Sequence, residues 1–151
     1  MKLFAILFIS SLIMVSCKQK SNADQVPTLP KDATVEAYET EILKIHDEAM
    51  PMMSELNQLE TQVRNIRMEA SKSDEGSSAM PDGIDDVLQS LKSAQNGMLD
   101  WMEYYSAMRT KLEQDVMMSF MQAELQKVAV VKKKMEESIS KAKVWIAAHP
   151  S

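Results

Sequence analysis

The sequence contains few turn-forming residues, few aromatic residues and almost no cysteine. Its 151 residues include three glycines, five prolines and one cysteine, and aromatic side chains make up 5%. A β-sandwich or a β-barrel needs a turn about every 8–12 residues, so this composition argues against both. Neither the dinucleotide-binding pattern G-x-G-x-x-G nor the phosphate-binding pattern G-x-x-x-x-G-K-[ST] occurs. A single cysteine also forms no disulfide within the chain.

Basic residues are too few for a nucleic-acid-binding protein. After residue 17 the chain has 16 basic and 22 acidic residues, a net charge of −6, whereas nucleic-acid binding requires a basic surface. Apolar residues make up 45% and charged residues 26%, which is typical of a folded domain, and the length suits a single one. The abundant residue is methionine, of which there are 14.

The first residues have the pattern of an export signal. Lys2 is followed by an apolar run from Leu3 to Val15 that is too short to span a membrane. The run ends at Ser16 and Cys17, and this ending resembles the lipobox of bacterial lipoproteins, in which the signal is removed and the cysteine carries the lipid. We therefore expect residues 1–16 to be a lipoprotein signal peptide and Cys17 to be acylated, for example with palmitate. The alternative is an ordinary secretory signal that leaves a free thiol.

The segment after Cys17 is polar and contains Pro27 and Pro30, so we expect residues 17–33 to form a tether. Acyl chains on Cys17 would attach the protein to a membrane. No acidic run follows the cysteine, although some bacteria use one as a signal for surface display. We expect a lipid-anchored protein of the bacterial cell envelope, on the outer membrane and facing the periplasm.

Apolar residues recur in alternating steps of three and four, the pattern of amphipathic helices. The first run is Val35, Tyr38, Ile42, Ile45, Ala49, Met52, Leu56, Leu59, Val63, Ile66 and Ala70. The second run is Ile84, Val87, Leu91, Ala94, Met98, Trp101, Tyr105, Met108 and Leu112. The third run is Met118, Met121, Leu125, Val128, Lys132, Met135, Ile139, Ala142 and Ile146. The sequence therefore predicts an all-α, up-down-up three-helix bundle in residues 34–149.

Three features define the expected helix ends. The phase of the first run continues through Pro51, which predicts one helix with a local bend rather than two helices. Residues 71–83 contain two glycines and a proline, which predicts a loop, and Asp82 is placed to cap the second helix. The phase breaks between Arg109 and Asp115, which predicts a turn; one continuous helix of about sixty residues is the alternative.

The charged residues are unevenly distributed between the expected helices. Residues 35–72 contain eight acidic and four basic residues, whereas residues 124–148 contain six basic and three acidic residues. We therefore expect ion pairs between the first and third helices. The run Lys132, Lys133 and Lys134 is either a solvated surface or a contact for lipid headgroups or a cell-wall polymer.

Three segments are similar to a family of small bacterial lipoproteins of unassigned function, some of which are mislabelled viral A-type inclusion proteins. They are His46 to Met53 (H-D-E-A-M-P-M-M), Leu99 to Met102 (L-D-W-M) and the Lys/Glu-rich stretch from Gln126 to Ile139. The similarity covers most of residues 35–148. It implies a lipidated cysteine and a helical domain, and it implies no reaction.

The side chains that could do chemistry are few. Only His46 could activate a serine, no G-x-S-x-G motif presents one, and no H-E-x-x-H motif occurs, so we expect no catalytic residues, no enzyme activity and no cofactor. The alternative is a soft-metal site. His46, Met50 and Met53 share one helix stripe, and Met102 and Met121 could approach it, because thioether and imidazole ligands select Cu(I) or Ag(I).

Ordinary core packing also explains the methionines, since three of them (Met52, Met108 and Met118) fall in core positions. With loops centred near residues 78 and 112, a residue of the third helix lies level with the residue about 69 positions earlier. Met117, Met118 and Met121 would then lie level with residues of about 48–52. We expect the packing interpretation to hold, with His46 partly exposed.

Together these patterns predict a lipid-anchored helical bundle that is a non-catalytic structural or protein-interaction module. Its expected partners are the membrane, through Cys17, and an envelope protein or a second copy of the chain, with no nucleic acid. The alternative function is a soft-metal binding protein.

Overall fold

A computed structural model of the chain describes residues 27–72 and 80–150, and all the regular structure within these ranges is helical. The elements are α1 (Val35–Lys72), α2 (Ile84–Arg109) and α3 (Gln114–Ala148). The predictions for the signal peptide, for Cys17 and for most of the tether lie outside the described residues.

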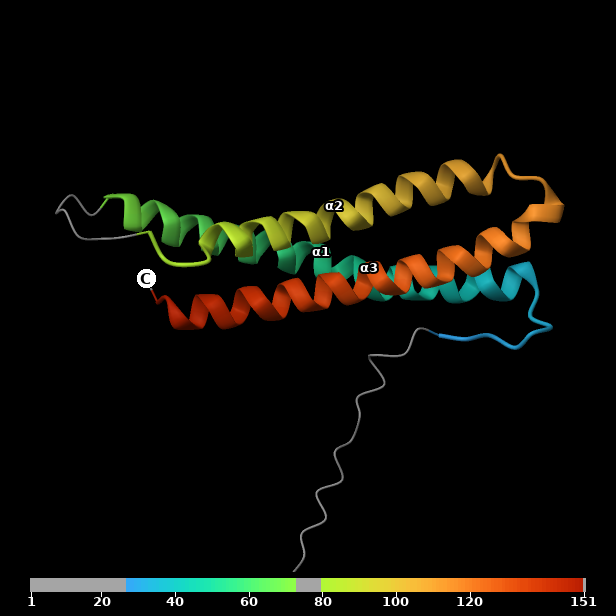
Figure 1. Ribbon diagram of the computed structural model, residues 1–151, viewed down its shortest axis with the longest axis horizontal. Coiled ribbons are helices and arrows are strands. Elements are labelled where there is room, and N and C mark those ends of the chain that lie inside the picture. The colour runs from blue at the N-terminus through green and yellow to red at the C-terminus, as the bar shows by residue number, and fades with distance from the viewer. Residues whose placement is uncertain (1–26, 73–79, 151) are drawn as a thin grey trace, which may run out of the picture.

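The three helices form an antiparallel, up-down-up bundle, as the apolar runs predict. Figure 1 shows the start of α1 at the same end of the bundle as the turn between α2 and α3. The end of α1 and the C-terminal end of α3 lie together at the opposite end. Each helix packs against both others, so the core lies along the common axis.

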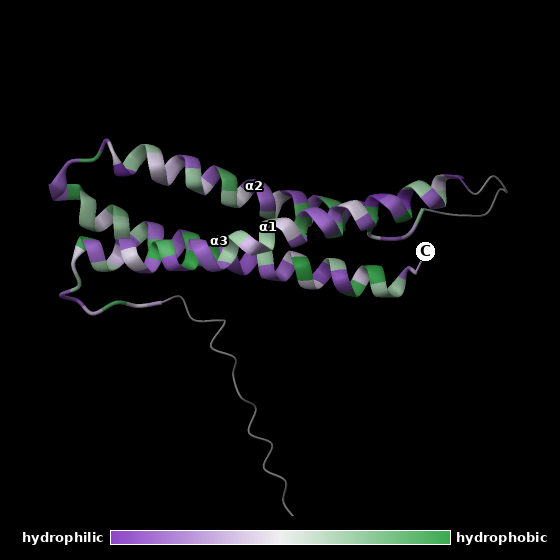
Figure 2. Cartoon of the chain, turned by 180° about the vertical axis from the view of Figure 1, so that it is seen from behind, coloured by the Kyte–Doolittle hydropathy of each residue, from purple (hydrophilic) through white to green (hydrophobic). Residues whose placement is uncertain are grey.

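Each helix is amphipathic. In Figure 2 hydrophilic and hydrophobic residues alternate along all three helices. Among the described residues, none of the helices has a stretch apolar enough to cross a bilayer.

Helix α1 continues through Pro51, and this confirms the prediction of a single first helix. Pro51 is exposed. Thr34 begins the helix, because its Oγ1 accepts a hydrogen bond of 3.3 Å from the backbone N–H of Ala37. Just before the helix, Leu29 and Ala33 pack against the core, so the last part of the expected tether is attached to the bundle.

Helix α2 begins without the predicted cap from Asp82. The N-cap residue is Gly83, whose φ of 75° lies in the left-handed region that favours glycine, and no side chain caps the helix. The carbonyl of Gly83 instead accepts a hydrogen bond of 3.0 Å from the backbone N–H of Val87. Asp82 contributes its backbone carbonyl, which accepts a hydrogen bond of 2.8 Å from the indole Nε1 of Trp145 in α3. The Asp82 prediction is therefore wrong, because the N-cap position falls one residue later, on Gly83.

A turn of four residues separates α2 from α3, as the break in phase predicts. The backbone N–H groups of Lys111 and Leu112 both donate to the carbonyl of Met108, at 3.1 Å. The hydroxyl of Thr110 donates to the carbonyl of Ala107 at 3.1 Å. These hydrogen bonds satisfy the last carbonyls of α2, so the chain reverses there without glycine or proline.

The buried face of α3 is wider than the predicted run. It consists of two adjacent stripes because α3 makes extensive contacts with both α1 and α2, whereas α1 and α2 contact each other less. The prediction that Met118 begins the core run is wrong, since Met117 is buried and Met118 is only half-buried. Met52 and Met108, also predicted in the core, are half-buried as well. The fully buried methionines are Met98, Met121 and Met135.

Ion pairs join α1 to α3, as the charge distribution predicts. Glu48 contacts the Nζ of Lys132 at 2.6 Å, and Glu55 contacts the Nζ of Lys143 at 2.6 Å. The first pair joins residues 84 positions apart, well beyond the expected offset of about 69. Met117 and Met118 therefore lie nearer the start of α1 than residues 48–52, and the predicted alignment is wrong.

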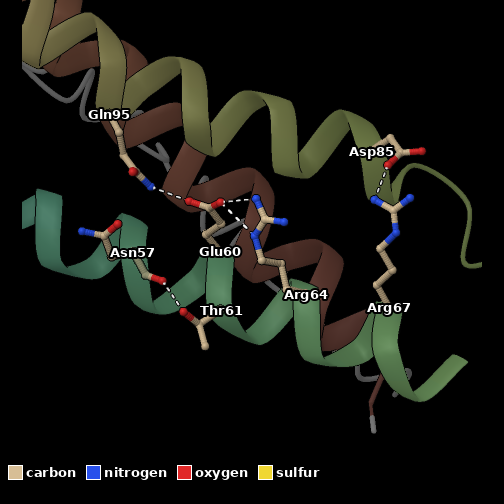
Figure 3. Close-up of polar contacts among 7 residues, drawn as sticks. All are labelled: Asn57, Glu60, Thr61, Arg64, Arg67, Asp85 and Gln95. Atoms are coloured by element: carbon tan, nitrogen blue, oxygen red, sulfur yellow. Dashed lines mark hydrogen bonds and ion pairs between the residues drawn. The ribbon is translucent and has the colours of Figure 1, made fainter. Parts of the chain in front are cut away.

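A second set of polar contacts joins α1 to α2. Glu60 accepts hydrogen bonds from Arg64 at 2.6 Å and from the amide of Gln95 at 3.0 Å, as Figure 3 shows. Further along, Arg67 pairs with Asp85 at 2.8 Å. The guanidinium of Arg64 holds the pKa of Glu60 below its usual range, so this carboxylate stays charged at neutral pH.

Candidate functional site

Four rings from all three helices form a chain of contacts near the α2–α3 turn. Trp101 stacks on Tyr105 with ring centroids 5.1 Å apart, and Tyr105 stacks on Phe120 at 5.9 Å. His46 completes the chain from α1, with its ring 5.9 Å from Trp101. Trp101 and Tyr105 are buried, so this aromatic cluster holds the helices together at this end of the bundle.

A carboxylate lies fully buried beside the aromatic cluster. Glu124 has no exposed surface, yet its Oε2 accepts a hydrogen bond of 2.9 Å from the indole Nε1 of Trp101. Its Oε1 is 2.7 Å from the Nζ of Lys127, which also lies 4.7 Å above the ring of Tyr104. The hydrogen bond to Glu124 raises the pKa of Lys127, so this ammonium group stays charged. Both carboxylate oxygens have partners, which makes burial of the charge tolerable.

Sequence reasoning missed Glu124, although a signal was present. Glu124 and Ser138 fall on the same alternation of three and four steps as Met117, Met121 and Val128. The prediction followed the neighbouring stripe through Leu125 and so left Glu124 out of the core run. When a helix has a second apolar stripe, a polar residue within that stripe is expected to be buried. This feature would have revealed Glu124.

A small groove opens between α1 and α2 at the edge of the aromatic cluster. Its volume is about 310 Å³, and its lining includes Leu43, His46, Trp101, Met102 and Arg109. Two of the polar side chains in it have partners within the chain. The Nδ1 of His46 lies 3.0 Å from the carboxylate of Asp47, and Arg109 forms two hydrogen bonds with Glu39, at 2.9 and 3.1 Å.

The residues of the metal hypothesis lie in three different environments. His46 and Met102 line the groove, and the side chain of His46 is 19% exposed, so the expectation that it is partly exposed is confirmed. Met50 and Met53 are half-buried against the core. Met121 is fully buried, and the hydroxyl of Tyr105 lies 3.7 Å from its sulfur. In the described part of the chain, no group of three His, Cys, Asp or Glu side chains is placed to hold a metal ion.

The three consecutive lysines have different environments. Lys132 is partly buried and pairs with Glu48, although sequence reasoning had placed it in a core position. Lys133 and Lys134 are exposed, and Lys134 lines a separate groove between α2 and α3. Lys134 therefore borders a concave surface.

The chain matches no protein-family model, no curated protein and no solved structure. The similarity to small lipoproteins therefore stays a prediction from the sequence.

Proposed function

We propose that this protein is a lipid-anchored helical bundle on the periplasmic side of a bacterial envelope membrane, where it binds another protein and catalyses no reaction. The observation that carries the proposal is the position of Cys17, the sole cysteine, directly after an apolar export signal. A lipid on this residue would attach the bundle through the segment that ends at Leu29 and Ala33, which pack against the core.

The environment of the polar side chains supports a binding role rather than catalysis. The carboxylate of Glu124 is fully buried with both oxygens paired, and most of the surface of the groove at His46 is apolar. An acid or base catalyst needs a free side chain directed at a substrate. Tyr104 and Val130, each 45% exposed, border the same hollow between α2 and α3, and adjacent exposed apolar side chains are suited to protein contacts.

Cell fractionation of a Cys17→Ser variant tests the anchor. The wild-type chain is expected in the outer-membrane fraction of a density gradient, and the variant is expected in the soluble fraction. A Ser21→Ala variant is the control and is expected to stay with the membrane. Protease added to intact cells is expected to leave the protein whole until the outer membrane is opened. A Cys17→Ser variant that still sediments with membranes would contradict the proposal.

The soft-metal alternative rests on one observation, that His46 and Met102 line the same groove. Titration of the chain without its signal segment with Cu(I), against a competing chelator, tests this alternative. Binding that disappears in both His46→Ala and Met102→Leu variants would support it. Binding that is equal in the wild type and both variants would exclude this groove as the metal site.

A further inference from the structure

A long groove follows the junction of α2 and α3. It consists of three hollows with volumes of about 490, 450 and 450 Å³. Val131 lines both the first and the second hollow, and Lys141 lines both the second and the third, so the three follow one another along the junction. All the lining residues come from α2, from α3 or from Gly83 just before α2. This junction groove therefore lies on the side of the bundle away from α1.

The floor of the junction groove is built for close approach by another chain. Ser90, Ser93, Ala94 and Gly97 lie at positions i, i+3, i+4 and i+7 of α2 and line the middle hollow. A Cβ added at Gly97 would meet nothing within 4 Å. Tyr104 and Val130 border the first hollow, and each is 45% exposed. A helix laid in the groove would bury these apolar side chains and form the fourth helix of the bundle.

A row of lysines at heptad spacing borders the groove on the α3 side. Lys127, Lys134 and Lys141 are each seven residues apart, and all three line the hollows. In an α-helix this spacing puts them in one row about 21 Å long. Lys134 has no hydrogen bond or ion pair within the described residues, and Lys141 bonds only to the backbone carbonyl of Asp86, at 3.3 Å. The acidic residues that line the groove are Asp86 and Glu137.

We propose that the junction groove binds an amphipathic helix of another envelope protein, which places a row of Glu or Asp side chains at seven-residue spacing against Lys127, Lys134 and Lys141. This inference rests on the proposed binding function and specifies the partner. Complementary charges beside an apolar seam select helix partners in the way that the flanking positions of a coiled coil do.

A second copy of this chain does not fit the groove in the same way. A symmetric dimer uses the same surface on both copies, so groove-to-groove docking would bring two rows of lysine into one interface. The acidic helix α1 of a second copy is already packed in its own bundle. A bilayer surface is flat and would not reach Gly97 and Ala94 at the bottom of the groove.

Two synthetic peptides of about three heptads test this proposal. Both have an Ala/Leu stripe, and one has Glu and the other Lys at every seventh position beside it. Binding of the labelled peptides to the full chain, solubilised in detergent, is measured by fluorescence anisotropy. The Glu peptide is expected to bind at least tenfold more tightly than the Lys peptide, and its affinity is expected to fall as salt is added.

Two variants localise the binding, each with a matched control. Gly97→Leu fills the groove floor and Lys134→Glu reverses one charge, and each is expected to weaken the Glu peptide at least tenfold. Asn96→Leu and Lys111→Glu make the same changes outside the groove and are expected to stay within twofold of the wild type. Equal binding of both peptides, no binding of either peptide, or unchanged binding by Gly97→Leu would overturn the proposal.

Two further outcomes separate this proposal from other occupants and from the proposed function. Binding of phosphatidylglycerol vesicles to the wild type but not to Gly97→Leu would show that the groove binds lipid, and this would overturn the proposal of a helix. A photo-crosslinker at Gln58 on α1 is compared with one at Gly97. Capture of a specific envelope protein at Gln58 and of none at Gly97 would overturn the groove as the binding site. That result would leave the binding function intact, whereas loss of membrane attachment is tested separately at Cys17.

Discussion

The indole Nε1 of Trp101 donates a hydrogen bond of 2.9 Å to the fully buried carboxylate of Glu124, and this bond joins α2 to α3 inside the bundle. Trp101 also stacks on Tyr105 and contacts the ring of His46. One side chain therefore links all three helices. The lysine that completes the pair with Glu124, Lys127, also begins the row of lysines along the junction groove.

Removal of Glu124 tests the energetic role of this hydrogen bond. Glu124→Ala leaves the indole N–H of Trp101 buried without a partner and creates a cavity, so we expect the free energy of unfolding to fall by about 2–4 kcal/mol. Glu124→Gln keeps an acceptor for the indole and is expected to cost about half as much. Urea denaturation followed by circular dichroism measures both. Equal losses in the two variants would show that the hydrogen bond is not the stabilising feature.

Replacement of Pro51 is expected to stabilise the protein. Pro51 lies inside α1 and is exposed, so Pro51→Ala supplies the missing N–H and removes the clash with the carbonyl of Asp47. We expect a gain of about 1–3 kcal/mol in the free energy of unfolding. Ser54→Ala, at an exposed position one turn later, is the control and is expected to change stability by less than about 0.5 kcal/mol. A loss of stability in Pro51→Ala would show that the core requires the proline.

The methionines should differ in their contribution to stability according to burial. Met98 is fully buried, so Met98→Ala is expected to cost about 2–5 kcal/mol. Met52 is half-buried, and Met52→Ala is expected to cost about half as much. His46→Ala removes the ring contact with Trp101 and the polar contact with Asp47 and is expected to cost about 1 kcal/mol or less. A His46→Ala variant as unstable as Met98→Ala would indicate that the imidazole has a larger structural role.

The carboxylate of Glu60 should make stability depend on acid pH. Its pKa in the folded chain is lowered, mainly by the hydrogen bond from Arg64, so its contribution is fully present above the ordinary carboxyl pKa. This contribution is lost as the pH falls through the lowered pKa of the folded state. Glu60→Gln should therefore reduce the loss of stability between about pH 5 and pH 2. Denaturation curves measured across this range test the prediction, and an unchanged slope would contradict it.

Apolar spacing predicted the architecture because each helix packs a continuous stripe into one core. The turn at residues 110–113 could be predicted because the phase breaks there, and Pro51 could be kept inside α1 because the phase does not. Spacing failed on α3, where contact with two helices buries Met117 and Glu124 beside the predicted stripe. One-dimensional periodicity follows a single stripe and cannot show when a helix has two.

The position of each helix along the bundle axis relative to the others could not be predicted, because it depends on the hydrogen bonds that hold each connection. Trp145 bonds to Asp82 and packs beside Gly83, which fixes the start of α2 against the end of α3. The α2–α3 turn is tightened by the hydrogen bonds to Met108. The predicted levels treat both connections as symmetric loops. Any error in level at the first connection adds to the error at the second. The prediction that Met117 and Met118 lie level with residues 48–52 is wrong for this reason.

Intact-mass spectrometry of the full chain extracted from membranes tests whether a lipid on Cys17 attaches this bundle to the envelope membrane. We expect a mature chain that begins at Cys17 and carries the added mass of its acyl chains. The added mass should lie on the N-terminal peptide and should be absent from the Cys17→Ser variant. A chain that begins elsewhere, or that begins at an unmodified Cys17, would contradict the claim.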